Sequence, residues 1–299
     1  MSYLARRLLQ TLAQIAALSL LGFALSSIAP GDVLSEASVD PQLRSGEVVR
    51  VLRQQMHLDE PWPLRYLHWI SGAVRGDFGS SLSYGLPVTE LIAPRLPRTL
   101  RIVVPAWTLS WIVGVLLAAT TVRLGISKWF DAMAAILQMI PEVILASLIT
   151  WPLLVYWRLD VDSVWLPLLP VALGLAPAVF LHAAGSFANA TASRPVQLAR
   201  LANLTTDRLW WRYLLPAAAN PLVSLLGPTL VAAFGSTLVV EAVTGWPGIG
   251  ALFLEAFKSR DYPLTQAILL LLGAALAFTN AFADLLLFKL DPRIRHASN

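Results

Sequence analysis

Residues Ala183 to Asn220 read AAGSFANATASRPVQLARLANLTTDRLWWRYLLPAAAN, and this stretch decides how the rest of the chain is organised. It is too polar for a lipid core, yet long apolar segments precede and follow it. Its apolar residues Leu209, Trp210, Tyr213 and Leu214 recur at helical spacing. We therefore expect residues 183–220 to form a cytoplasmic loop of two short helices that presses on a soluble partner. Thr205 or Thr206 is expected to cap the second helix, with Asp207 stabilising its first turn, and Pro216 and Pro221 are expected to end it.

The whole chain is far more apolar than a soluble protein. Of its 299 residues, 57% are hydrophobic and 13% are charged, whereas a soluble domain has about 25% charged residues. This composition predicts an integral membrane protein. The chain has no cysteine, which excludes a disulfide framework, a thiolate metal site and a cysteine nucleophile. Its few histidines are scattered, so we expect no metal site.

Apolar segments divide the chain into six candidate spans. Each is near the roughly 20 residues that cross a hydrocarbon layer of about 30 Å. Their ranges are residues 8–28, 100–122, 132–157, 164–182, 222–243 and 264–287. An alternating β-barrel pattern is absent, so the spans are expected to be helices. The fold class predicted is an all-α integral membrane protein with six transmembrane helices, the first retained rather than cleaved as a signal peptide.

Lysine and arginine distribution predicts the orientation of these spans. With the N-terminus inside, the short outer loops hold only Arg158, Lys258 and Arg260. The cytoplasmic pieces then hold Arg6, Arg7, Arg123, Lys128, Arg194, Arg200, Arg208, Arg212, Lys289, Arg293 and Arg295. Both termini are therefore expected to be cytoplasmic.

Three parts are expected along the chain: a transmembrane helix over 1–29, an extracytoplasmic segment with interfacial helices over 30–98, and a five-helix core with its loop over 99–299. In the second part, Gly76 and Gly79 permit left-handed backbone and predict a turn. This part is either a rim that receives a substrate-delivery protein or a collar that braces the helices.

Glu142 follows Pro141 inside an apolar segment, where an ionisable residue is expensive and is a functional candidate. Together they are candidate residues of a translocation pathway, in which the carboxylate meets a cationic or amine group of the cargo. Alternatively, Glu142 is protonated, or it bonds the backbone groups that Pro141 leaves free.

Motifs along nearly the full length resemble one family. They are YLARRLLQ (3–10), PGD (30–32), LDEPWPLRYLHWI (58–70), GDFGSSLSYGLPVTELIAPRLPRTL (76–100), VVEAVTGWPGIG (239–250), RDYP (260–263) and DPRIR (291–295). In this order they resemble the first permease of the dipeptide/oligopeptide/nickel class of ABC transporters. The resemblance implies a MetI-like core of the type I importers in a bacterial inner membrane. It also implies structural roles for Asp32, Gly76, Asp77, Gly79, Glu241, Trp246, Pro247, Gly248, Gly250, Asp261, Asp284, Asp291 and Arg293.

The same resemblance implies that the polar loop couples the chain to an ATPase. The family pattern A-R-A-x-G-L aligns with residues 199–204, where Asn203 replaces the glycine; asparagine is the next most tolerant of left-handed backbone. Tyr213 and Ala217 replace a family histidine and asparagine. The coupling residues implied are Val196, Ala199, Arg200, Ala202, Asn203, Leu204, Arg208 and Arg212. The alternative is a helix pair lying on the inner leaflet.

The implied function is that of an importer permease for peptides, nickel or a related small solute. A second homologous permease, two ATP-binding subunits and an extracytoplasmic binding protein are its expected partners. The chain has no phosphate-binding loop and no nucleophile–base pair, so we expect neither a cofactor nor a catalytic residue in it. The rivals are an ion-coupled transporter or channel, which needs several paired intramembrane charges, and a membrane enzyme, which needs a catalytic pair.

Overall fold

A computed structural model describes residues 3–28, 60–202 and 204–290 of the chain. Its contacts form two compact units: residues 1–98 with 247–278, and residues 99–246 with 279–299. The two units are described separately. Within the described residues the regular elements are helices, and Ser80 and Pro87 form an isolated bridge. The division at residues 29 and 98 that we expected stays a prediction.

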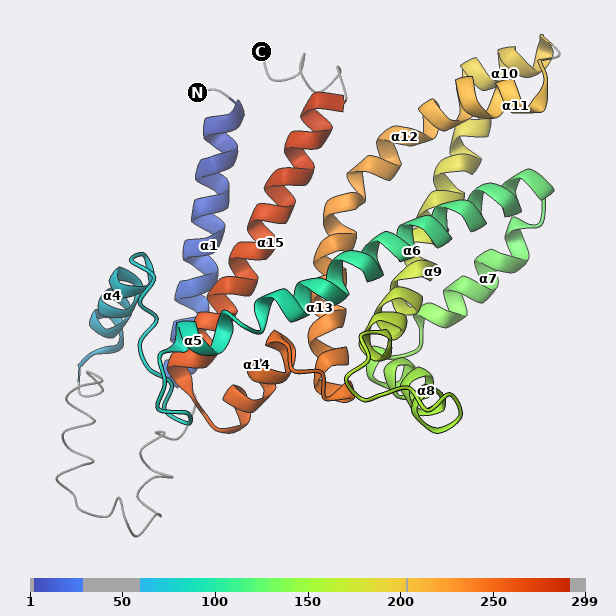
Figure 1. Cartoon of the computed structure of the whole chain (residues 1–299). Helices are drawn as coiled ribbons and strands as arrows, with labels where there is room; N and C mark the ends of the chain where they lie inside the picture. The colour runs from blue at the N-terminus through green and yellow to red at the C-terminus, as the bar shows by residue number, and fades with distance from the viewer. Residues whose placement is uncertain (1–2, 29–59, 203, 291–299) are drawn as a thin grey trace. The chain divides into compact units, whose positions relative to one another are not determined.

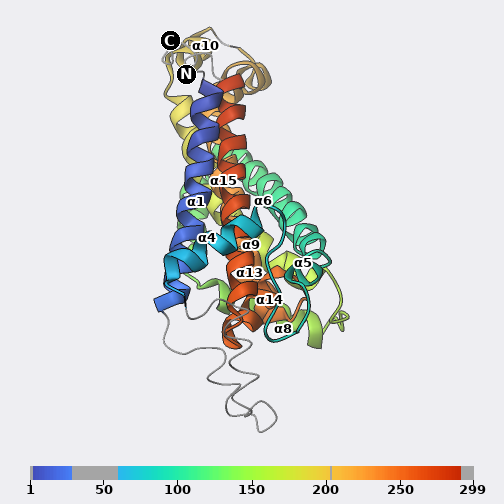
Figure 2. The ribbon, with the colours of Figure 1, turned by 90° about the vertical axis from the view of Figure 1, so that its left-hand side faces the viewer.

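The first unit contains two long helices that lie side by side in both views, α1 (Tyr3–Ile28) and the first part of α15 (Tyr262–Leu290) (Figures 1 and 2). A Cβ atom added at Gly22 would lie 3.5 Å from Leu269, so these helices pack closely. Among the residues described here, the unit also contains three short helices: α4 (Trp62–Ala73), α5 (Val88–Ile92) and α14 (Ile249–Lys258).

Aromatic residues join α4 to α1. Phe23 of α1 is buried and stacks edge-on against Tyr66 of α4, with ring centroids 5.5 Å apart. The Tyr66 hydroxyl also hydrogen-bonds the Ser19 hydroxyl at 2.8 Å. Tyr and Trp have an apolar body and a polar tip, which suits a helix at a membrane–water interface.

The second unit is built around α9 (Trp165–Thr191), which packs against its neighbours along its length. Phe180 and Phe187 of α9 are almost fully buried in the apolar core. The other helices are α6 (Leu96–Leu124), α7 (Ser127–Gln138), α8 (Glu142–Val155), α10 (Arg194–Leu201), α11 (Thr206–Leu209), the π-helix η1 (Trp210–Leu214), α12 (Leu215–Ser224) and α13 (Leu226–Thr244).

Small residues allow α6 to approach α9 closely. A Cβ atom at Gly114 would lie 2.8 Å from the Val179 side chain, so no larger residue fits there without movement. The Ser110 hydroxyl donates to the Ala172 carbonyl at 2.9 Å across the same interface. Close backbone approach and side-chain hydrogen bonds are the usual means of helix association in lipid.

Five described helical segments are long and apolar enough to cross a membrane: Arg6–Leu25, Val88–Leu124, Trp165–Thr191, Leu226–Thr244 and Tyr262–Phe282. A sixth is present if α7 and α8 count as one span. The segment expected over 132–157 is not straight, because α7 and α8 meet at a 98° bend. Pro141 lies at this bend, and its carbonyl accepts hydrogen bonds from the amides of Ile144 and Leu145.

Two expected boundaries were wrong. We expected the polar loop to begin at Ala183, but α9 continues to Thr191 because Ala183, Ala184 and Phe187 pack in the core. We also expected Pro216 and Pro221 to end the second loop helix. Both lie inside α12, which continues to Ser224. Pro216 lies in the first turn, where proline is tolerated because the amide has no helical partner. Pro221 lies inside the helix and does not end it.

Candidate functional site

The loop at the end of α9 consists of α10, α11 and η1, which lie together in both views (Figures 1 and 2). Helix α10 begins after Ser193, whose extended backbone precedes Pro195 in the first turn. Val196 and Ala199, three residues apart, are buried. This spacing turns one face of α10 inward, so Val196 and Ala199, two of the predicted coupling residues, hold the helix in place.

The returning limb packs against α9. Thr205, one of the two threonines expected to cap the second loop helix, occupies the N-cap position of α11, but its side chain makes no cap hydrogen bond. Trp210 stacks against the buried Phe187, with centroids 5.5 Å apart, and Leu214 is 1% exposed. The predicted helical spacing is confirmed, because Leu209, Trp210, Tyr213 and Leu214 all join the core around α9. The π-helix at this point was not predicted.

Other side chains of the loop are exposed. Leu198 is 65% exposed, Leu201 is 80% and Trp211 is 74%. Arg200, Arg208, Arg212 and Ala202 are also exposed, whereas Leu204 is half-buried. We call Leu198, Arg200, Leu201, Arg208, Trp211 and Arg212 the exposed loop residues. Large apolar side chains beside arginines are the composition favoured at protein–protein interfaces.

An ion pair ties this loop to α6. Nη2 of Arg123, at the end of α6, lies 2.9 Å from Oδ1 of Asp207 in α11. The two residues are 84 positions apart in the chain. We had expected Arg123 to orient a span and Asp207 to stabilise a helix N-terminus, but the sequence does not show that they meet.

We expect the Arg123–Asp207 pair to contribute at most about 1 kcal/mol, because both side chains are more than half exposed. A double-mutant cycle with Arg123→Ala and Asp207→Ala, measured by thermal unfolding in detergent, checks this value. Salt should weaken the coupling. A coupling energy above about 2 kcal/mol, or one that salt does not change, would contradict this expectation.

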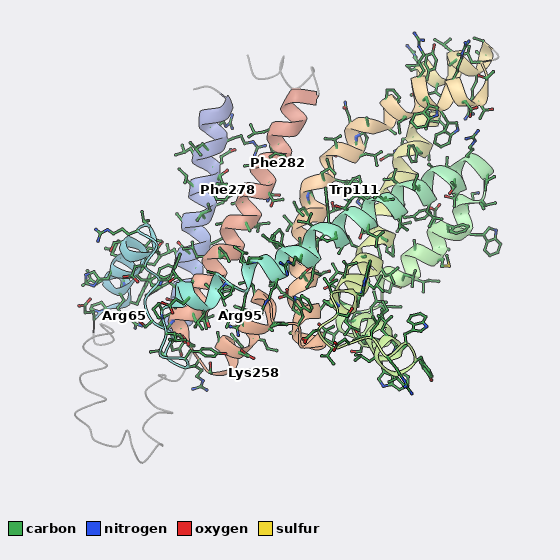
Figure 3. All side chains as sticks on the ribbon, in the orientation of Figure 1. Arg65, Arg95, Trp111, Lys258, Phe278 and Phe282 are labelled. Carbon is green, nitrogen blue, oxygen red and sulfur yellow. The ribbon has the colours of Figure 1, made fainter. Side chains whose placement is uncertain are left out.

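Glu142 lies in the first turn of α8 rather than deep within a straight span. Its Oε1 atom accepts a hydrogen bond from the hydroxyl of Ser236 on α13. Thr229, also on α13, accepts hydrogen bonds from the indole N–H groups of Trp107 and Trp111 at 3.0 and 2.9 Å. Both tryptophans lie on α6, where Figure 3 shows Trp111. Side-chain hydrogen bonds thus join α13 to both α8 and α6.

Asp261, in the RDYP motif, organises the turns that precede α5 and α15 in the first unit. It is fully buried. One carboxylate oxygen accepts the Ser81 hydroxyl at 2.5 Å and the Ser83 amide at 3.1 Å, and the other accepts the Leu264 amide at 3.2 Å. The last bond is an N-cap of α15. One side chain therefore both caps a helix and holds the 81–83 turn.

The turn motif beside α4 has the expected left-handed glycines, Gly76 at φ +84° and Gly79 at φ +81°. The Asp77 amide donates to the Gly72 carbonyl at 3.0 Å, and its Oδ1 accepts the Gly79 amide at 2.9 Å. This pattern is an Asx turn, in which a short carboxylate replaces a backbone acceptor.

Other motif residues divide between the units. Trp246 packs against the core of the second unit, in which Glu241 is fully buried within α13. In the first unit, Arg98 donates to the Pro247 carbonyl at 3.5 Å, Gly248 is the N-cap of α14, and Gly250 is buried. Asp284 is half-buried on α15. Asp32, Asn203, Asp291 and Arg293 lie outside the described residues.

The sequence did not predict a contact between the 80–87 turn and α14. The Tyr84 hydroxyl donates to Oε2 of Glu255 at 2.6 Å. This hydrogen bond, together with burial, raises the pKa of Tyr84 above its ordinary value of 10.0. A raised pKa means that the stabilisation is fully present below pH 10 and is lost only as the pH rises through the folded-state pKa. The contact is therefore intact at neutral pH.

Comparison with known proteins identifies the class. Residues 110–296 match the family described as "Binding-protein-dependent transport system inner membrane component". This match covers more than half of the chain, so the chain belongs to that family. It is a multi-pass membrane component of a transport system.

Curated relatives are similar over almost their full length. The chain is 28% identical to the "Probable peptide ABC transporter permease protein y4tP" of Sinorhizobium fredii, covering 98% of the chain and 99% of the relative. It is 28% identical to the "Oligopeptide transport system permease protein OppB" of Haemophilus influenzae, covering 99% and 100%. It is also 28% identical to the "Glutathione transport system permease protein GsiC" of Escherichia coli, covering 99% of each.

A solved structure has the same fold. A chain of the MetNI methionine ABC transporter, in an inward-facing conformation, superposes with a TM-score of 0.58. The superposition covers 67% of this chain and 96% of that one, at 18% identity. The expected MetI-like core is confirmed as the fold of this chain.

Proposed function

We propose that the chain is the first of two permeases in an ABC importer that carries peptides across a bacterial inner membrane. A second homologous permease completes the pathway, two separate ATPase subunits bind and hydrolyse ATP, and an extracytoplasmic protein delivers the peptide. The chain itself performs no catalysis. Its family supports this function, and so do relatives named as permeases for peptides, oligopeptides and glutathione.

The loop at the end of α9 is the observation that carries the proposal. Val196, Ala199, Trp210 and Leu214 fasten it to the core, while the exposed loop residues present apolar and basic groups outward. A rigid loop whose exposed residues bind an ATPase can transmit the movement of that ATPase to α9. Rigid-body rocking of packed helices then exposes the pathway to each side in turn.

Charge distribution in the second unit supports a cytoplasmic loop. The ion pair to Asp207 brings Arg123 to the same end of the unit as Arg194, Arg200, Arg208 and Arg212. The turn between α8 and α9 carries Arg158 with Asp160 and Asp162. Because cytoplasmic loops are enriched in Lys and Arg, we place the α9–α10 end inside. We also place the N- and C-termini in the cytoplasm, and Pro141 and Glu142 on the pathway.

The test is uptake by the assembled transporter. The chain, the second permease, the ATPase subunits and the binding protein are purified together and reconstituted in liposomes with radiolabelled tripeptides. We expect uptake that needs ATP and the binding protein and that persists with proton and sodium ionophores. Uptake by this chain without ATPase subunits, abolished by an ionophore, would instead identify the ion-coupled transporter.

A further inference from the structure

The surface between α8 and α13 carries an isolated carboxylate. Glu142 is the only charged residue between positions 132 and 157. It is exposed at the surface of its unit, beside the exposed apolar residues Val143 and Ile144. A charge in so apolar a surface is costly in a membrane protein unless a partner compensates it.

The described residues supply only part of that compensation. The Ser236 hydroxyl, on the buried face of α13, donates to one oxygen of Glu142. An ionised carboxylate has about four acceptor positions, so one hydroxyl leaves it with free capacity. The first turn of α8 also favours a negative charge. In the described part of this unit, Arg123 pairs with Asp207, and no ion pair reaches Glu142.

Small residues lie near Ser236 in the sequence of α13. Ala232 and Gly235, three residues apart, are exposed, and a Cβ atom at Gly235 would meet nothing within 4 Å. The site therefore combines a carboxylate bound by one hydroxyl, exposed apolar neighbours on α8 and exposed small residues on α13. A carboxylate in this setting binds an ammonium or guanidinium group most strongly, because a low dielectric strengthens a charge-assisted hydrogen bond.

We propose that Glu142, positioned by Ser236, binds a positively charged group of the transported peptide during its passage. This inference rests on the proposed function and adds the chemistry that this chain selects. The group is either the N-terminal ammonium or the side chain of lysine or arginine. Ser236 is a positioning residue, since it orients the carboxylate and does not itself carry the charge.

Reconstituted transporter tests the proposal with four cargoes: Ala-Lys-Ala, trialanine, and the N-acetylated form of each. Glu142→Gln removes the charge and keeps the shape. We expect it to lower uptake of Ala-Lys-Ala about tenfold, the effect of one charge-assisted hydrogen bond. N-acetyl-trialanine carries no cation, and its uptake should stay within about twofold of wild type on the same principle.

The other two cargoes distinguish the sources of the cation. If the N-terminal ammonium binds, trialanine uptake falls and N-acetyl-Ala-Lys-Ala uptake does not. If the lysine side chain binds, uptake of N-acetyl-Ala-Lys-Ala falls and uptake of trialanine does not. Glu142→Asp should restore part of the loss, and Ser236→Ala should show the same selectivity with a smaller effect. Glu90→Gln, an exposed acid on α5, is the matched control and should leave uptake of all four unchanged.

Two outcomes would overturn the proposal. An equal loss for all four cargoes would show that Glu142 supports the structure or pairs with a cation of the second permease. Unchanged uptake of all four in a folded Glu142→Gln transporter would show that its charge meets no cargo. If Glu142→Gln does not fold, the selectivity of Ser236→Ala decides. Wild-type transporter that imports no peptide at all would refute the proposed function rather than this inference.

Discussion

Replacing Leu198 and Leu201 by aspartate is expected to lower ATP-driven peptide uptake at least about 100-fold while the chain stays folded. Both side chains are largely exposed, at 65% and 80%, so the substitutions remove little packing within the chain. Burying a leucine side chain against a partner contributes about 1.5–3 kcal/mol, and each 1.4 kcal/mol is a factor of ten in affinity. Two aspartates in their place would also have to lose their hydration against the apolar contact surface of the ATPase, which is costly.

Uncoupling is the result that distinguishes this loss from simple damage. The purified transporter should still hydrolyse ATP at a basal rate, but peptide-loaded binding protein should no longer stimulate hydrolysis. The double substitution Arg200→Ala with Leu204→Asp should act in the same direction. Its effect is expected to be mixed with some destabilisation, because Leu204 is half-buried.

Gln197→Asp is the matched control for the leucine variant. It introduces the same charge on α10 at an exposed polar position, so most uptake should remain. Thermal unfolding of the leucine variant should match that of wild type. Wild-type coupling in the Leu198→Asp, Leu201→Asp transporter would refute the role of the loop as the ATPase contact, and would favour a helix pair that touches lipid.

Local sequence patterns predicted the helices that bury one apolar face and the turns that need glycine. Leu209, Trp210, Tyr213 and Leu214 recur at helical spacing, and they all pack on α9 because a helix buries one face. Gly76 and Gly79 have the left-handed backbone that only glycine adopts without strain. The long apolar segments became helices because lipid leaves no other way to satisfy the backbone.

Contacts between distant segments were not predictable from one sequence. Ser81 and Asp261 are 180 positions apart, and Arg123 and Asp207 are 84 apart. No periodicity or composition connects such pairs. The bend before Glu142 was predictable only as a kink at Pro141, because the sequence does not determine the angle, which is 98°. Glu142 therefore came to the surface of the unit, where a straight helix would have suggested a deep position.

Asp261→Ala is expected to destabilise the chain by about 3–5 kcal/mol, a large share of the 5–15 kcal/mol of a typical domain. The carboxylate is fully buried and accepts hydrogen bonds from Ser81, Ser83 and Leu264. Alanine leaves the buried Ser81 hydroxyl and Leu264 amide without this acceptor, at a cost of about 1–3 kcal/mol each. The Ser83 amide belongs to an exposed residue, so the loss of its hydrogen bond should cost less. The substitution also removes the N-cap of α15.

Thermal unfolding of the purified chain in detergent measures this effect. At about 2–4 °C per kcal/mol it corresponds to a fall in melting temperature of about 6–20 °C. Asp261→Asn should cost less, because its amide oxygen can still cap α15. Some cost remains, because its NH₂ group cannot accept the hydrogen bond from the Ser83 amide. Ser81→Ala should cost about 1 kcal/mol, since it removes one bond of the network.

The exposed Asp162 provides the comparison, because Asp162→Ala changes the same residue type outside any buried network. Its effect should be within about 0.5 kcal/mol. If Asp261→Ala unfolds at the same temperature as Asp162→Ala, the hydrogen bonds of Asp261 do not hold the 81–83 turn against α15. The loss of stability should decrease from Asp261→Ala to Asp261→Asn to Ser81→Ala. This order is specific to one shared acceptor, because a general loss of packing would not follow the number of hydrogen bonds removed.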